Sequence, residues 1–116
     1  MGSNKHNGLL KGSLQLIVLK LLQQRGRMYG YELTQVVKEI TDGEILLTEG
    51  ALYPALHKME KEGLLATTVE LVDNRARKYY ALTPAGKLEV EVKLKETKSF
   101  LENLHLLLHL TPKKLA

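Results

Sequence analysis

The hydrophobic positions change their spacing several times along the chain, and each change predicts an element of secondary structure. From Ser13, a potential cap, to Leu22 the sequence is apolar over most of a helical circumference, which predicts a helix buried on more than one side. Between Tyr29 and Thr41, apolar residues recur at the i, i+3, i+4, i+7 spacing of a second, amphipathic helix. The run 44–47 is short, partly β-branched and bounded by turn residues, so it predicts a brief strand.

A third helix is predicted from Thr48, which can cap it, to Gly63, which can stop it. Pro54 lies inside this helix, where a proline removes one backbone hydrogen bond and crowds the carbonyl four residues earlier. That earlier residue is Gly50, whose missing side chain leaves room to adjust. The apolar residues that share one face of the helix are Leu52, Leu56 and Met59.

Two segments of alternating apolar residues flank the loop 72–77 and predict a β-hairpin with a basic tip. Thr83 and Pro84 then supply a cap and a first-turn proline for a last helix, whose pattern runs to about Leu110. A helix of that length is too long for this small domain to cover.

This order of elements predicts a mainly α (α+β) fold, a winged helix-turn-helix with an appended long C-terminal dimerisation helix. We expect a disordered N-terminus at 1–8, a DNA-binding domain at 9–83, a dimerisation helix at 84–110 and a tail at 111–116.

Composition narrows the possible functions. The 116 residues suit one domain, and the absence of Cys excludes a disulfide scaffold, a zinc ribbon and a thiol nucleophile. The sequence shows no membrane-spanning run and no signal peptide, so we expect a cytoplasmic protein. No serine lies in a nucleophile elbow and no glycine-rich phosphate loop occurs, so we expect no catalytic residue, no cofactor and no enzyme activity. The net charge of +4 permits a polyanionic partner without requiring one.

The predicted architecture indicates where double-stranded DNA would bind. Its third helix enters the major groove and its hairpin, the wing, lies along the backbone or minor groove. Between Asp73 and Lys78 the chain has three cations against one carboxylate, a net charge of +2. Small residues near the start of the third helix allow close approach to DNA. The candidate DNA-binding residues are Tyr29, Tyr31, Thr48, Gly50, Ala51, Tyr53, His57, Lys58, Asn74, Arg75, Arg77 and Lys78.

Several of these residues have a second interpretation. Tyr53 can contact a phosphate or pack at the edge of the core, since tyrosine has one polar and one apolar end. Arg75 and Arg77 can form an ordinary solvated turn, but their position in a hairpin after a helix-turn-helix favours DNA contact. The lysines of the third helix can form a solvated face. Glu60 and Glu62 would repel phosphate, so the second half of this helix is expected to point away from DNA.

The last helix has apolar residues in steps of four and three, interrupted by one threonine, and this spacing predicts a dimer seam. Because the first helix already packs in the core, we expect a partner subunit to cover this face of the last helix. Leu106, Leu107 and Leu110 add apolar surface that the partner's first helix can cover. The seam residues are Val90, Leu94, Thr97, Leu101, Leu104 and Leu108.

A metal site is the other interpretation of the last helix. Glu102, His105 and His109 fall on one face if the helix continues through all three residues. Two histidines seldom complete a site and no further ligand cluster is evident, so we expect no bound metal.

The sequence resembles the PadR family of bacterial transcriptional regulators from Leu9 to about Leu108, as a small member with a single C-terminal helix. The segments that carry the resemblance are LKGSL at 10–14, YGYEL at 29–33, EGALYPALHKMEKEGL at 49–64 and RKYYALTPAG at 77–86. The resemblance implies a homodimeric repressor in which the C-terminal helix forms the dimer, and it makes Pro54 a family feature.

Family members often sense small molecules near the dimer interface, so an effector of unknown identity is a further expected partner. The chain has no Trp and only one Phe, which does not support an aromatic-lined pocket there. We therefore predict a dimeric repressor that binds a palindromic operator and releases it on a signal. The alternative is a winged-helix module that binds proteins and no DNA. The three wing cations favour the repressor, because a protein-binding module has no need of them together.

Overall fold

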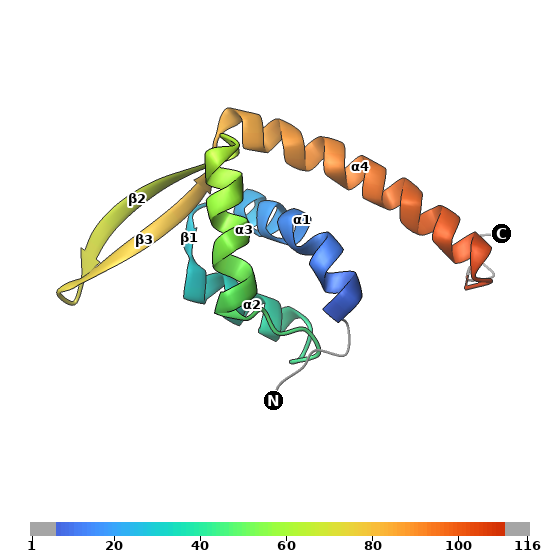
Figure 1. Cartoon of the computed structure of the whole chain (residues 1–116), viewed down its shortest axis with the longest axis horizontal. Coiled ribbons are helices and arrows are strands. Elements are labelled where there is room, and N and C mark those ends of the chain that lie inside the picture. The colour runs from blue at the N-terminus through green and yellow to red at the C-terminus, as the bar shows by residue number, and fades with distance from the viewer. Residues whose placement is uncertain (1–6, 111–116) are drawn as a thin grey trace.

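The computed structural model describes residues 7–110, in which the chain forms four helices and three strands (Figure 1). Three helices pack around the core, a long β-hairpin leaves the core on one side, and the last helix extends from it on the other. The elements are α1 (Asn7–Arg25), β1 (Met28–Tyr29), α2 (Gly30–Ile40), α3 (Glu49–Lys61), β2 (Leu65–Val72), β3 (Arg75–Leu82) and α4 (Pro84–Leu107).

Helix α1 lies at the centre of the fold, in contact with both α3 and α4. Its residues Val18 and Leu19 are almost fully buried, which confirms the prediction of a helix covered on more than one side. From α3, the predicted inner face of Leu52, Leu56 and Met59 is fully buried in the same core. Burying large apolar side chains from several elements together is the main stabilising contribution to the fold.

The start of α1 differs from the prediction. The helix begins at Asn7, and the Ser13 hydroxyl donates a hydrogen bond to the Leu9 carbonyl, 3.1 Å away, from a position inside the helix. The predicted cap at Ser13 is therefore wrong, because a serine can also bond back to the preceding turn of a helix that continues. Residues 7–8 belong to α1, while the rest of the N-terminal segment expected to be disordered, and the tail 111–116, lie outside the described residues.

The strand predicted at 44–47 is also wrong. That segment is a bend, in which the Thr41 hydroxyl accepts a hydrogen bond from the Ile45 backbone N–H at 3.0 Å. The third strand is β1, which pairs antiparallel with β3 through Met28↔Tyr80 and Tyr29↔Tyr79, so the sheet order is β1-β3-β2. A strand of two residues shows no periodicity that could predict it.

Helix α3 has the predicted ends. Thr48 Oγ1 accepts a hydrogen bond from the Ala51 backbone N–H (3.2 Å), and Gly63 ends the last turn in the left-handed conformation with φ +81°. A Cβ at Gly50 would meet nothing within 4 Å apart from neighbouring backbone of its own helix. A side chain at position 50 would therefore not meet the Pro54 ring, so the structure does not support the expectation that glycine is needed there to accommodate the proline.

Strands β2 and β3 form the predicted hairpin with a tighter turn than expected. They pair from Leu65↔Leu82 to Val72↔Arg75, and the turn is Asp73 and Asn74 alone, with φ +51° and +63°. Two consecutive left-handed residues suit the turn type that follows the twist of a hairpin. The predicted loop 72–77 is therefore too long, and Arg75 and Arg77 belong to β3.

Helix α4 starts as predicted, with Thr83 Oγ1 accepting from the Gly86 backbone N–H (3.0 Å) and Pro84 at its first position. It ends at Leu107, three residues before the predicted end. Its first half packs on α1, and its second half extends beyond the other helices (Figure 1).

Candidate nucleic-acid interface

Helix α3 lies beside the hairpin of β2 and β3 (Figure 1), and its first residues are exposed. Thr48, Gly50 and Ala51 are all exposed there. Gly50 and Ala51 add little bulk to the first turn of α3, and among the described residues this turn borders an open hollow that it shares with Leu10, Lys11 and Leu14 of α1.

A polar cleft of about 370 Å³ lies between the hairpin and the start of α2 and the middle of α3. We call it the wing cleft. Chain segments nearly fifty residues apart meet in it, and six of the predicted DNA-binding residues contribute to its lining. The lining residues are Tyr29, Gly30, Tyr31, Tyr53, His57, Ala76, Arg77, Lys78 and Tyr80.

Tyr53 packs its ring against the backbone of Gly30. A Cβ at Gly30 would overlap with the Tyr53 ring and hydroxyl, so only glycine fits this contact. Tyr53 remains half-exposed. This packing supports the interpretation that Tyr53 lies at the edge of the core, while its contact with a phosphate stays a prediction.

Arg77 is held by aromatic side chains. Its guanidinium lies 4.2 Å from the centre of the Tyr29 ring, and Tyr29 meets Tyr79 edge to face at 5.5 Å. Hydrogen bonding to the Tyr79 side chain raises the pKa of Arg77. A stacked arginine loses less side-chain freedom when it binds an anion, and it is oriented in advance for one.

Two cations beside the hairpin have carboxylate partners. Lys78 Nζ is 3.6 Å from Glu60 Oε1, and an Arg27 guanidinium nitrogen is 2.6 Å from Glu70 Oε2. The hydrogen bond between Arg27 and Glu70 lowers the pKa of the Glu70 carboxyl and raises the pKa of Arg27.

The remaining predicted DNA-binding residues lie outside the wing cleft. Asn74 and Arg75 are exposed at the hairpin end, and Lys58 is exposed on α3. In the part of the chain that the structure describes, neither Arg75 nor Lys58 forms an ion pair. These two cations are therefore available to a polyanion, unlike Lys78.

Arg27 and Glu70 were missed as site residues by the sequence analysis, and Glu60 was considered only as a repulsive charge. Arg27 and Glu70 are 43 residues apart in the chain, so no helical or strand spacing relates them. One signal could have helped. Glu70 lies in the alternating hairpin segment directly opposite Arg77, which indicates a charged outer face of the sheet.

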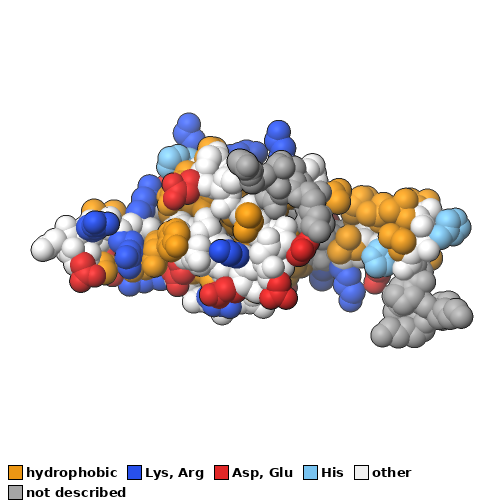
Figure 2. All heavy atoms as spheres, turned by 90° about the horizontal axis from the view of Figure 1, so that it is seen from below, with side chains coloured by type: hydrophobic (Ala, Val, Ile, Leu, Met, Phe, Trp, Pro, Cys, Tyr) orange, Lys and Arg blue, Asp and Glu red, His pale blue; other side chains and the backbone are white. Residues whose placement is uncertain are grey.

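Helix α4 exposes a large apolar surface at its free end. Figure 2 shows hydrophobic side chains gathered along this end, whereas the opposite end, with the hairpin, carries Lys and Arg side chains mixed with acidic and hydrophobic ones. Leu101 is 47% exposed and Leu107 75% exposed. The other exposed large apolar residues of this region are Phe100, Leu106, Leu108 and Leu110.

The first members of the predicted dimer seam have another role. Val90 is fully buried inside the chain, so it belongs to the core and cannot lie in an interface. Leu94 packs against the same core. The heptad spacing predicts which residues share a face, but α1 covers the first part of that face. Thr97, Leu101, Leu104 and Leu108 remain at least partly accessible.

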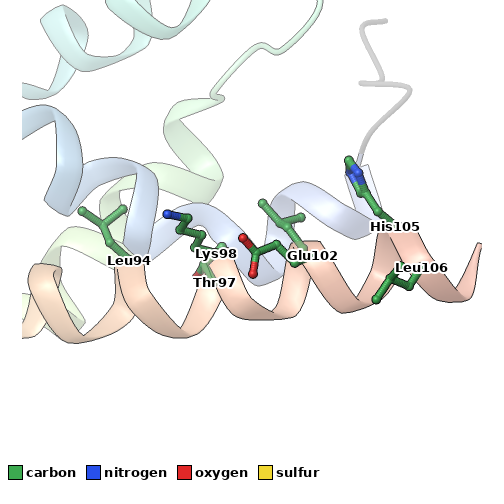
Figure 3. Close-up of a pocket in the computed structure, with 7 residues that line it drawn as sticks. Leu94, Thr97, Lys98, Glu102, His105 and Leu106 are labelled. Carbon is green, nitrogen blue, oxygen red and sulfur yellow. The ribbon is translucent and has the colours of Figure 1, made fainter. Parts of the chain in front are cut away.

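A groove of about 550 Å³ runs along the second half of α4 (Figure 3). Leu94, Lys98, Glu102 and His105 rise from one side of the helix in this view. Thr97, Leu101 and Leu106 complete the lining.

His105 and His109 do not have the helical spacing that would put them on one helix face as metal ligands. The Leu110 backbone N–H donates to the His105 carbonyl (2.8 Å), and His109 follows the helix end with φ +58°. His109 therefore does not lie one turn beyond His105 on a helix face. Within residues 7–110 no group of three or more potential ligands could hold a metal ion.

Among the described helices, none combines the length and the apolar character that a membrane span requires.

Comparisons with known proteins agree with this geometry. The model of the transcriptional regulator PadR-like family matches residues 18–92. The Transcriptional regulator Rv3488 of Mycobacterium tuberculosis is 42% identical over 60 residues, which cover 52% of this chain and 53% of that protein. A transcriptional regulator from Clostridium thermocellum has a similar structure, with a TM-score of 0.78 and 28% identity over 84% of this chain and 95% of its own. A PadR-like transcription factor from Bacteroides fragilis aligns with a TM-score of 0.71 and 26% identity over 90% of this chain and 99% of its own.

Proposed function

We propose that this chain, which belongs to the transcriptional regulator PadR-like family, is a repressor that binds a palindromic DNA operator as a homodimer. The family consists of transcriptional regulators and not of enzymes. One observation carries the proposal. The wing cleft gathers tyrosines, a histidine and a stacked arginine from three separate segments, on the helix whose exposed first turn carries Gly50 and Ala51.

In the proposed complex the first turn of α3 enters the major groove and reads bases. Gly50 and Ala51 supply the close approach, and we expect Tyr31 and Tyr53 to contact the phosphates that flank the groove. The stacked Arg77 and the free Arg75 contact the backbone on the hairpin side. The end of α3 stays away from DNA, because Glu60 and Glu62 would repel phosphates.

The apolar end of α4 supports the proposed dimer. Leucine side chains with half or more of their surface exposed favour association, because burying them against a second copy removes apolar area from water. Residues 9–83 then form the DNA-binding unit and 84–110 the dimerisation helix. Two-fold symmetry of such a dimer requires a roughly palindromic operator.

The groove along α4 is the place we propose for an effector. Its apolar lining with Lys98, Glu102 and His105 at one side suits a small molecule with an apolar body and a polar group. Binding there would change how two α4 helices pack, and thus the separation of the two α3 helices. A regulator with this role acts where the chromosome lies, which agrees with the cytoplasmic location expected from the sequence.

Selection from a pool of random DNA duplexes tests the proposed DNA binding. The full chain is expected to enrich inverted repeats, and an enriched duplex should bind more tightly than a scrambled duplex of the same composition. Failure to enrich any sequence, with no binding at low salt, would favour the alternative of a protein-binding module.

Sedimentation equilibrium tests the proposed dimer. We expect a dimer at micromolar concentration, and we expect removal of residues 101–116 to give monomers or insoluble protein. A soluble dimer after this truncation would overturn the assignment of the interface to α4. Leu88→Ala, which changes an exposed apolar residue at the start of α4, is the matched control and should remain dimeric.

A further inference from the structure

We infer that Glu60 and Glu70 are positioning residues that hold the hairpin from its two faces at the angle needed for DNA contact. In this arrangement Lys78 and Arg27 bind the two carboxylates and not phosphates. The inference rests on the proposed function, and it reassigns Lys78, which the sequence predicted as a DNA contact.

The outer half of the hairpin has few side chains in the core. Leu65 and Tyr80 are buried near its base, whereas Val69 is 63% exposed and Leu71 77% exposed nearer the turn. Backbone pairing of β2 with β3 keeps the two strands together, but it does not fix the hairpin relative to α3. Contacts between the hairpin and other elements must therefore fix its orientation.

Glu60 makes such contacts on the face of the hairpin next to α3. Its Oε2 accepts a hydrogen bond from the Thr67 hydroxyl at 3.2 Å, and its Oε1 lies 3.6 Å from Lys78 Nζ. Thr67 belongs to β2 and Lys78 to β3. One carboxylate from α3 therefore contacts both strands: β2 at Thr67, which pairs with the buried Tyr80, and β3 at Lys78, two residues before Tyr80.

Glu70 makes the matching contact on the opposite face. Its partner Arg27 comes from the segment between α1 and β1, and the Arg27 guanidinium also lies 4.2 Å from the centre of the Tyr79 ring. A second contact joins Arg27 to the Thr68 hydroxyl at 3.5 Å. Because β3 lies between β1 and β2, the Arg27 side chain crosses the sheet from one edge strand to the other.

The two carboxylates act on opposite faces of the hairpin. The contacts of Glu60 join the hairpin to α3, and the contact of Glu70 joins it to Arg27, which follows the end of α1. Loss of either should let the hairpin move away from the position shown. A purely electrostatic role predicts the opposite effect on DNA binding. A carboxylate near phosphates repels them, so its removal alone would tighten binding.

The test compares Glu60→Ala and Glu70→Ala with Glu62→Ala in the full chain. Glu62 is an exposed carboxylate at the end of α3 that forms no ion pair among the described residues, so it is the matched control. Two properties are measured: the affinity for a selected operator duplex, and the hydrogen exchange of hairpin amides in the protein without DNA.

We expect Glu60→Ala and Glu70→Ala to bind the operator more weakly than the unmodified chain, by about three- to fivefold for each hairpin in the complex. This factor corresponds to the free energy that an exposed ion pair contributes. Their hairpin amides should exchange faster by a similar factor, while amides of α1 are unchanged. Glu62→Ala should bind DNA as tightly as the unmodified chain or more tightly, with unchanged exchange. The double variant Arg27→Glu with Glu70→Arg keeps the net charge and should recover affinity relative to Glu70→Arg alone.

The inference is overturned if Glu60→Ala and Glu70→Ala bind DNA as well as Glu62→Ala does, or if their hairpin exchange is unchanged. If the unmodified chain binds no DNA, the proposed function fails. In that case the exchange measurement still decides whether the two carboxylates hold the hairpin.

Discussion

Replacing Arg75 by alanine should weaken DNA binding through a lost phosphate contact and leave base recognition intact. Arg75 is exposed at the first position of β3, opposite Val72 beside the turn, and it forms no ion pair within residues 7–110. Each phosphate contact contributes about 0.9 to the slope of log K against log salt concentration. A dimer carries two copies of Arg75, so the slope should fall by about 1.8.

The same relation gives the expected loss of affinity. At about 0.1 M salt each lost contact reduces the binding constant roughly eightfold, and two lost contacts reduce it about 60-fold. Operator and scrambled duplexes should lose affinity alike, so the preference between them should survive.

Fluorescence anisotropy titrations of labelled operator and scrambled duplexes at several salt concentrations measure both quantities. Arg25→Ala is the matched control, because it removes an exposed arginine at the end of α1, outside the proposed interface, and should keep the slope of the unmodified chain. An unchanged slope for Arg75→Ala would refute the reasoning and show that this arginine only solvates the turn.

Three further substitutions test the fold and the α3 interface. Thr48→Ala removes the hydrogen bond to the Ala51 backbone N–H and should lower the free energy of unfolding by about 1 kcal/mol in urea denaturation, whereas Thr48→Ser should not. Gly86→Ala places a Cβ against the Leu64 carbonyl oxygen, so its midpoint of thermal unfolding should fall, and an unchanged midpoint would contradict the packing at the start of α4. Gly50→Val has open space at its Cβ and should fold, yet it should lose the preference for operator over scrambled DNA by blocking close approach to bases.

The starts of α3 and α4 and the hairpin were predictable because their signals are local. Thr48 and Thr83 each cap a backbone N–H only three residues ahead, so the sequence around each cap contains the whole interaction. The alternation of β2 and β3 likewise predicted a hairpin. Its two-residue turn was not predicted, because Asp73 and Asn74 take the left-handed conformation without a glycine that would mark it.

Features that depend on distant residues were not predictable. The pairing of β1 with β3 joins Tyr29 to Tyr79, and the Arg27–Glu70 ion pair joins residues 43 apart. Val90 shows the same limit for packing. Its heptad position predicts a shared face with Leu101, but only the structure shows that α1 covers Val90 and leaves Leu101 exposed.

Footprinting of DNA upstream of the gene for this chain tests the central claim, binding of a dimer to a two-fold symmetric operator. The account predicts two protected half-sites related by inverted symmetry, with centres about 34 Å apart along the duplex, one helical turn of DNA. Protection of a single half-site, or no protection of this or any other DNA at low salt, would contradict it.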